Sequence, residues 1–263
     1  MINHSFSHKI VITGKHQAPC FIIISISESA TLVNKWAFDI LLEDNHLLVL
    51  SKPTGLPTAH GEIKGDSLFD YAKEYIKKRY AKPGNVFLGV VHRLDQPVSG
   101  IVIFAKTSKA ASRLSEQFRD TKVEKTYLAV VEGVPNDRSG TLHHFLVNDD
   151  EERMALVSNQ NNPLAKEAIT HYTVLATYDN HAFLMLSPKT GRKHQLRIQL
   201  SASGHPVMGD KKYGSSFNFV HGISLHAQAI TFKHPVKDET ISLKVDLPKI
   251  WLKHFGSWIK VPT

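Results

Sequence analysis

Cysteine is almost absent from this chain, which has 263 residues and a single cysteine, Cys20. One cysteine cannot form an intrachain disulfide, and it excludes zinc sites built on several cysteines. The chain also shows no His/Asp ligand spacing typical of a metal site, so we expect no metal. Such low cysteine usage fits a reducing compartment, and we expect a cytoplasmic protein.

Long hydrophobic runs are also missing. The longest early apolar run, at residues 20–26, is interrupted by Ser25 and is far shorter than the roughly 20 residues that span a bilayer. The residues before it are mixed and His-rich, and no small-residue cleavage site follows, so it does not resemble a signal peptide. We expect no membrane association and interpret this run as a short β-strand.

Acidic residues are fewer than basic ones, with 24 Asp and Glu against 32 Lys and Arg, which gives a formal net charge of +8. A basic surface favours polyanions such as nucleic acid, although charge alone does not name the partner. Hydrophobic residues make up 42% and charged residues 21%, a composition typical of globular proteins and not of long disordered chains.

The chain divides into two parts by its patterning. Residues 1–35 are weakly patterned and are interpreted as an N-terminal extension, whereas residues 36–263 form the expected catalytic domain. Two helices are predicted, at 67–81 with Asp66 or Ser67 as cap and at 108–120 with Thr107 or Ser108 as cap. A short helix is expected at 194–203 before Gly204. Strand patterns occupy the segments 38–50, 86–91, 101–105, 125–132, 168–178, 182–186, 225–232 and 241–245.

Strands outnumber helices and often follow one another directly. This order argues against a doubly wound parallel sheet. We expect an α+β fold with a mixed, mostly antiparallel sheet, a few flanking helices and a central active-site cleft.

The segment 91–100 carries His92, Arg93 and Asp95 in a loop between two strands. Loops on a rigid sheet are frequent places for reactive groups. The alternative interpretation is structural, with Asp95 capping a turn before Pro97, Arg93 in solvent and His92 packed in the core.

The segment 189–200 places four basic residues within nine positions at the start of a predicted helix. Arg192 and Lys193, together with the positive helix N-terminus, form a possible phosphate seat. A solvated basic turn is the alternative, but the helical register of Leu196 and Leu200 makes it less attractive. Tyr127 near the start of a strand is, taken alone, better explained as a core or edge aromatic than as a catalyst.

Six segments together resemble the RluA family of pseudouridine synthases, in the family's order and over roughly residues 38–247. The matching patterns are D-x-x-L-L-V-L-x-K-P-x-G-L-P at 44–57, H-R-L-D-x-x-x-S-G at 92–100, K-x-Y-x-A-x-V-x-G at 125–133, G-R-x-H-Q-L-R at 191–197, G-H-P-x-x-G-D-x-x-Y-G at 204–214 and L-H-A…F-x-H-P at 225–235. Each pattern is modest alone, but six in sequence leave little room for coincidence.

The resemblance implies an enzyme that isomerises uridine to pseudouridine in ribosomal or transfer RNA. Asp95 resembles the catalytic aspartate, which attacks the sugar or the base or removes a sugar proton, and the sequence leaves these routes open. Arg197 resembles the arginine that pairs with that aspartate, and Tyr127 the active-site tyrosine. No cofactor is implied, because the reaction is redox-neutral and remakes one bond to the same base.

The resemblance also implies which residues contact RNA and line the pocket. His92 and Arg93 resemble loop residues that enter the RNA when the uridine is flipped out of its stack. The further expected RNA contacts are Lys52, Arg192, Lys193, His194 and Gln195, and the expected pocket residues are Leu94, Leu196 and His226. We expect a monomer without an obligate protein partner.

The chain departs from the family in two respects. Val98 stands where the family usually has Thr, which removes a hydroxyl contact. Residues 1–35 are too short for the small N-terminal RNA-binding domain that many members carry. Two other functions fit the sequence less well. A catalytically inactive RNA-binding module is disfavoured by the intact Asp95, Tyr127 and Arg197. A hydrolase using Asp95 with a histidine is supported by no nucleophile-elbow or metal-ligand pattern.

Overall fold

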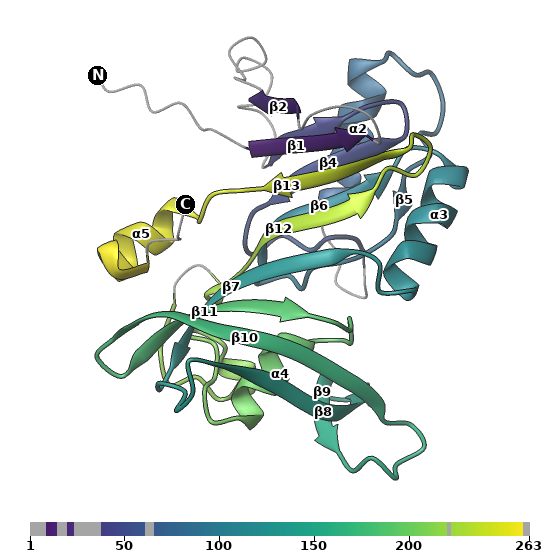
Figure 1. Cartoon of the computed structure of the whole chain (residues 1–263). Helices are drawn as coiled ribbons and strands as arrows, with labels where there is room; N and C mark the ends of the chain where they lie inside the picture. Colours follow the sequence, from purple (N-terminus) through teal and green to yellow (C-terminus); the bar gives the residue numbers. More distant parts are fainter. Residues whose placement is uncertain (1–8, 15–19, 24–37, 61–65, 220–221, 260–263) are drawn as a thin grey trace. The chain divides into compact units, whose positions relative to one another are not determined.

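The computed structural model describes the chain except residues 1–8, 15–19, 24–37, 61–65, 220–221 and 260–263. The chain forms two compact units (Figure 1). The first unit comprises residues 1–124 and 228–246, and the second comprises residues 125–227 and 247–263. Each unit is described separately below.

The first unit is built on antiparallel strand pairs. In chain order its strands are β1 (Lys9–Gly14), β2 (Cys20–Ile23), β3 (Asp39–Glu43), β4 (Leu47–Lys52), β5 (Gly89–Val90), β6 (Ser99–Ala105), β12 (Leu225–Lys233, shared with the second unit) and β13 (Glu239–Lys244). β2 pairs with β1, β1 with β13, and β13 with β12. β3 pairs with β4, and β6 pairs with both β4 and β5.

All seven residues of β6 are buried, which shows that this strand lies at the centre of the unit. Its continuous apolar run is the pattern of a strand covered on both faces. Ile101 and Ile103 pack with Val49 of β4 and with Phe232 and Leu243 of the C-terminal strands in one hydrophobic cluster. This core fixes the ends of β4 and β6, from which the loops described below emerge.

Two helices of the first unit begin at side-chain caps. α2 (Leu68–Arg79) is capped by Ser67, and Ser67 and Asp70 form a reciprocal capping box. α3 (Ser108–Arg119) is capped by Thr107, whose hydroxyl accepts from the backbone N–H of Ala110. Both helices were predicted to within two residues at each end, including one of the two candidate caps in each case.

The second unit contains an antiparallel sheet in the order β7–β11–β10–β8–β9. Its strands are β7 (Glu124–Glu132), β8 (Ser139–Asp149), β9 (Met154–Ser158), β10 (Lys166–Tyr178) and β11 (His181–Pro188). The helical segments are α4 (Gln195–Ala202), η1 (Lys211–Tyr213), α5 (Lys249–Phe255) and η2 (Gly256–Ile259). Residues 195–200 of α4 are all buried.

The expected α+β class with a mostly antiparallel sheet is confirmed. Most predicted strands are present, although the expected strand at 86–91 is reduced to the two residues of β5. β8, β9 and α5 were not predicted. The expected central cleft stays a prediction. No helix in the described part of the chain is long and apolar enough to cross a membrane.

The expected N-terminal extension at 1–35 contains two strands in its described residues. β1 pairs with β13 over six residue pairs, from Lys9 opposite Lys244 to Gly14 opposite Glu239. β2 then pairs with β1. The extension therefore adds backbone hydrogen bonds to the edge of the first unit's sheet, and the domain boundary at residue 35 stays a prediction.

Candidate active site

Asp95 lies in the loop between β5 and β6 of the first unit. The backbone carbonyl of Asp95 accepts a hydrogen bond from the N–H of Val98 at 3.0 Å, which closes a turn over Gln96 and Pro97. The side chain of Asp95 is half-buried. The turn that the structural interpretation predicts is therefore present. It is closed by the backbone carbonyl of Asp95, so this hydrogen bond does not use the carboxylate.

The segment that follows β4 holds this loop on both sides of Asp95. The hydroxyl of Thr58 donates to the carbonyl of Leu94 at 2.7 Å and accepts from its N–H at 3.0 Å. On the other side, the N–H of Gly55 donates to the carbonyl of Gln96 at 2.9 Å, and the hydroxyl of Thr54 donates to the carbonyl of Pro97 at 2.7 Å. Four bonds thus fix the backbone around Asp95 before any substrate arrives.

Lys52, the last residue of β4, lies beneath these two segments with 1% of its surface exposed. Its ammonium group donates to the carbonyls of Pro53, Leu56 and Gln96 at 2.9, 2.7 and 3.1 Å. Burial lowers the pKa of Lys52 to about 7, and the negative charge of Asp95 opposes this shift. An RNA contact by Lys52, as the sequence suggested, would require these bonds to open; the geometry supports a positioning role.

His92 is packed and Arg93 is exposed, although both were expected to enter RNA. The Nε2 atom of His92 accepts from the backbone N–H of Ile103 at 2.9 Å, and its ring stacks on Phe118 with centroids 4.7 Å apart. Leu94, expected in the pocket, is 7% exposed. Of the three residues His92, Arg93 and Leu94, only Arg93 is exposed to solvent.

In the second unit, Arg197 of α4 forms a buried two-point ion pair with Asp210. Its Nε donates to Oδ2 at 2.6 Å and its Nη2 to Oδ1 at 2.8 Å, and the two residues are 5% and 2% exposed. The ring of Tyr213 lies over the guanidinium, with its centroid 4.9 Å from Cζ. The pairing of Arg197 with Asp95 stays a prediction from the resemblance.

Gln195 is built into the second unit's own hydrogen-bond network. Its Oε1 accepts from the hydroxyl of Thr190 at 2.7 Å and from the N–H of Arg192 at 3.0 Å. Its Nε2 donates to the carbonyl of Ile169 and to the hydroxyl of Thr170. Both amide protons are used, so an RNA contact by Gln195 would have to replace one of these bonds.

The remaining predicted residues of the 191–197 segment differ in exposure. Arg192 and Lys193 are exposed, and Arg192 also donates from Nε to the carbonyl of Glu167 at 2.9 Å. The Nδ1 of His194 is 2.8 Å from the hydroxyl of Tyr213. Leu196 is 7% exposed. Arg192 and Lys193 therefore keep the surface position that a phosphate contact needs.

Two further predicted residues lie on strands that contribute to the second unit. Tyr127 of β7 stands opposite Leu186 of β11 and is half-buried. His226, at the second-unit end of β12, is 3% exposed, and its ring centroid lies 6.1 Å from that of Trp251. That Asp95 meets Tyr127 and Arg197 during the reaction stays a prediction from the resemblance.

Sequence reasoning missed the residues that support the predicted ones. Thr58 holds the Asp95 loop, and Asp210 and Tyr213 hold Arg197. The signal for the last two was in the G-H-P-x-x-G-D-x-x-Y-G pattern, to which no role was given. Within the described residues, no group of three or more His, Cys, Asp or Glu side chains is placed to hold a metal ion.

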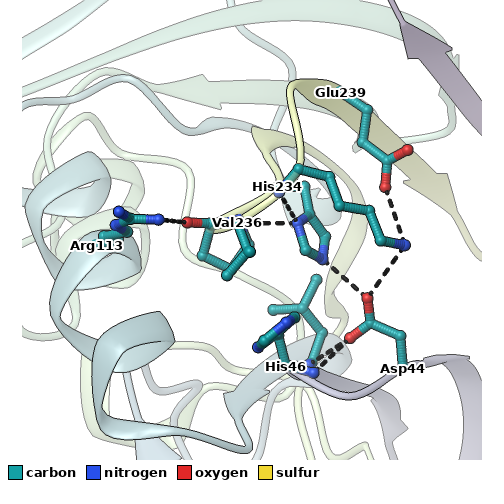
Figure 2. A network of polar contacts seen from close by, with 9 residues as sticks. Asp44, His46, Arg113, His234, Val236 and Glu239 are labelled. Atoms are coloured by element: carbon teal, nitrogen blue, oxygen red, sulfur yellow. Dashed lines mark hydrogen bonds and ion pairs between the residues drawn. The ribbon is translucent and has the colours of Figure 1, made fainter.

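Two other matched patterns meet in a structural network of the first unit, which Figure 2 shows from close by. His234, from the F-x-H-P pattern, is bonded through Nε2 to Oδ2 of Asp44 at 2.8 Å. The Oδ1 atom of Asp44 accepts from the N–H groups of His46 and Leu47, both at 2.7 Å. The network ties the β3–β4 turn to the β12–β13 turn, so these patterns serve the fold.

Comparisons with known proteins agree with the sequence resemblance. The family model for RNA pseudouridylate synthase matches residues 46–202. The chain is 35% identical over 207 residues to the dual-specificity RNA pseudouridine synthase RluA of Haemophilus influenzae, covering 78% of this chain and 90% of that protein. It is 31% identical over 233 residues to the ribosomal large subunit pseudouridine synthase C of Buchnera aphidicola, covering 84% and 70%.

A solved human structure, RNA pseudouridylate synthase domain containing 4, is similar with a TM-score of 0.68 at 27% identity. The similarity covers 85% of this chain and 92% of that one. The fold and six patterns therefore agree with the family match over most of the chain. This chain belongs to the RNA pseudouridine synthase family, with the RluA-type enzymes among its relatives.

Proposed function

We propose that this protein isomerises specific uridines to pseudouridine in structured ribosomal or transfer RNA. Family membership gives the reaction class. The observation that carries the assignment to Asp95 is the bracing of its loop by Thr54, Gly55 and Thr58. A carboxylate that attacks or deprotonates the nucleotide must be held in one position, and this loop supplies that constraint.

The reaction needs no external oxidant or reductant. The bond between N1 of uracil and the anomeric carbon breaks, and a bond from C5 of the same base to that carbon forms. C5 then loses its proton to solvent while N1 gains one. Asp95 is proposed to act on the nucleotide, Tyr127 to contact the base and transfer a proton, and Arg197 to orient a carboxylate through its planar N–H groups.

RNA binding is assigned to the exposed basic side chains. Arg93 lies two residues before the proposed catalytic aspartate and is exposed, as are Arg192 and Lys193 ahead of α4. Phosphate contacts of this kind position RNA without reading its sequence. The target uridine has to leave its stack, because a base inside a helix does not present C5 and the sugar to a carboxylate together. We propose a cytoplasmic monomer.

The test is the release of tritium from RNA carrying [5-³H]uridine. The RNA is prepared from a strain in which the gene is deleted, so that the target sites are unmodified. Release of tritium to water by the purified protein, together with pseudouridine in the digested RNA, supports the proposal. RNA binding without tritium release would instead favour the inactive RNA-binding module.

A further inference from the structure

The second unit contains a preformed support for Arg197, made of Asp210 and Tyr213. We propose that these two residues are positioning residues for the reaction, which set the plane of the Arg197 guanidinium before RNA binds. This inference rests on the proposed function, because it assigns a task to residues that act through Arg197.

The ion pair between Arg197 and Asp210 has a two-point geometry. Asp210 uses Nε and Nη2, which lie on one side of the planar guanidinium, at 2.6 and 2.8 Å. Two parallel bonds fix rotation as well as distance, which a single contact does not do. Because Asp210 occupies this one side, the directions of the other N–H bonds of Arg197 are set by the same contact.

Tyr213 completes the support of Arg197. Its ring covers one face of the guanidinium at 4.9 Å. Its hydroxyl accepts from the backbone N–H of Ala155 at 2.8 Å and contacts Nδ1 of His194 at 2.8 Å. The Tyr213 ring is therefore held by Ala155 of β9 and by His194. Together, Asp210 holds one edge of the Arg197 guanidinium and Tyr213 covers one face of it.

The turn that carries Asp210 is rigid. The N–H of Asp210 donates to the carbonyl of Val207 at 3.0 Å. Gly209 before it has φ +86°, and a Cβ there would lie 2.5 Å from Cβ of Phe219 and 2.9 Å from the carbonyl oxygen of Gly222. Only glycine fits this position, so the backbone delivers Asp210 to Arg197 in one conformation.

The charges explain why a neutral substitute would not serve. Arg197 is buried, and a buried guanidinium keeps its charge only at a high desolvation cost unless a carboxylate pairs with it. With Asp210 the pair is neutral overall, and Arg197 can offer hydrogen bonds in a fixed direction. Without Asp210 the guanidinium loses the two bonds that set its plane.

The experiment measures kcat and KM for wild type, Asp210→Asn, Arg197→Lys and the double variant, on the tritium-labelled RNA from the deletion strain. We expect Asp210→Asn to lower kcat about 100-fold, the size typical of a small misplacement of a reacting group, while KM changes less than about threefold. If Asp210 acts only through Arg197, the double variant loses no more than about threefold beyond the slower single variant.

The control is Glu132→Gln at the end of β7, which makes the same carboxylate-to-amide change at a residue that binds the segment after Tyr213. The carboxylate of Glu132 binds Ser215 and Ser216 and accepts from the N–H of Phe217. This variant should melt at a lower temperature than wild type and keep kcat within about threefold. Should Asp210→Asn fail to fold, Tyr213→Leu keeps the ion pair and removes the ring, and it should lower kcat about tenfold at unchanged KM.

Two results would overturn the inference: kcat of folded Asp210→Asn within threefold of wild type, or losses in the double variant that multiply. If Asp210→Asn does not fold, kcat of Tyr213→Leu within threefold of wild type overturns it. An inactive wild type would contradict the proposed function instead, and the two failures are therefore distinct.

Discussion

His234 donates its Nε2 proton to Asp44 over 2.8 Å, although the two residues are 190 positions apart in the chain. The donor is identified by the other ring nitrogen, because Nδ1 accepts from the N–H groups of Val236 and Lys237 at 3.1 and 2.8 Å. The contact to Asp44 is therefore made by Nε2, and the side chain of His234 is fully buried. This bond closes the network of Figure 2.

Replacing Asp44 should weaken the fold without affecting chemistry. Asp44→Ala removes the acceptor of the buried His234 proton and of two backbone N–H groups, and we expect a loss of about 2–3 kcal/mol in the free energy of unfolding. Urea unfolding measures this, and kcat of the folded variant should remain within about twofold. Asp39→Ala, at an exposed position of β3, is the matched control and should cost under about 0.5 kcal/mol. An Asp44→Ala variant as stable as that control would contradict the network's role.

The pH dependence of Asp44 has a defined sign. Hydrogen bonds from His46 and His234 outweigh burial and lower the pKa of Asp44 below its usual value. Its contribution to stability is therefore present above the unfolded pKa, near 4, and is lost as the pH falls through the lower folded pKa. The stability difference between wild type and Asp44→Ala should shrink as the pH falls below about 4. A difference that stays constant over this range would argue against it.

Lys52 gives a pH dependence of the same sign on the alkaline side. Its folded pKa of about 7 lies below the usual 10.5, so the folded protein binds fewer protons than the unfolded chain between these values. Wild type should therefore gain stability relative to Lys52→Met as pH rises from 7 to 9, by up to about 1.4 kcal/mol per pH unit. Lys122, exposed and with its pKa raised by Asp120, is the control, and Lys122→Met should show no such slope. A flat difference for Lys52→Met would contradict the burial of a titrating ammonium.

Asp95→Asn tests the proposed catalytic carboxylate. The amide keeps the size of the side chain and removes the negative charge, so turnover should become undetectable. RNA affinity, measured by fluorescence anisotropy, should stay within about threefold or rise, because a negative charge facing a polyanion is gone. Turnover within tenfold of wild type would rule out Asp95 as the reacting group.

Salt tests the assignment of the exposed cations. If about 4–6 phosphates are neutralised, the logarithm of the affinity should fall with the logarithm of salt concentration with a slope of about −3 to −5. The double variant Arg192→Gln/Lys193→Gln should reduce the steepness of that slope by about 1–2. A slope unaffected by this change would place the phosphate contacts elsewhere on the protein.

Removal of residues 1–35 tests the extension. The deletion removes β1 and leaves one side of β13 without its six paired residues, so we expect a loss of about 2–4 kcal/mol in stability. Every matched pattern lies beyond residue 38, and kcat of the folded remainder should stay within about threefold. A deletion of residues 1–8 keeps both strands and is the control. Equal melting temperatures for the two deletions would show that β1 adds nothing to the sheet.

The helices and central strands could be predicted because their signals are local. The apolar run of β6 and the caps of α2 and α3 lie within a few residues of the elements they define. β8 and β9 could not be predicted in this way. β8 is held by backbone pairing with β10 and β9, and its exposed His143 is paired with Glu167 across the sheet. The pairing of β8 with β10 depends on a partner that follows it beyond β9 in the chain, as for Leu146 opposite Lys166.

The site shows the same division. The sequence patterns around Asp95, Tyr127 and Arg197 could be recognised. Which polar side chains of the site are buried could not be predicted from the sequence. Lys52 and Gln195 were expected to contact RNA, whereas in the structure each is bonded to a backbone carbonyl of another segment. The acceptors are the backbone carbonyls of Gln96 and Ile169, which no residue type in the sequence marks. Only the folded chain therefore shows that the side chains of Lys52 and Gln195 already have hydrogen-bond partners.

The division of the chain between its two units has a consequence for biosynthesis and for engineering. The chain crosses between them after Glu124, after Ala227 and after Asp246, and the second of these crossings falls inside β12. A ribosome that has made residues 1–124 has not yet made any part of β12 or β13, on which the first unit's core depends. Neither unit can be completed by a single contiguous segment. Exchange of the first unit between relatives would require junctions after Glu124, Ala227 and Asp246 at the same time.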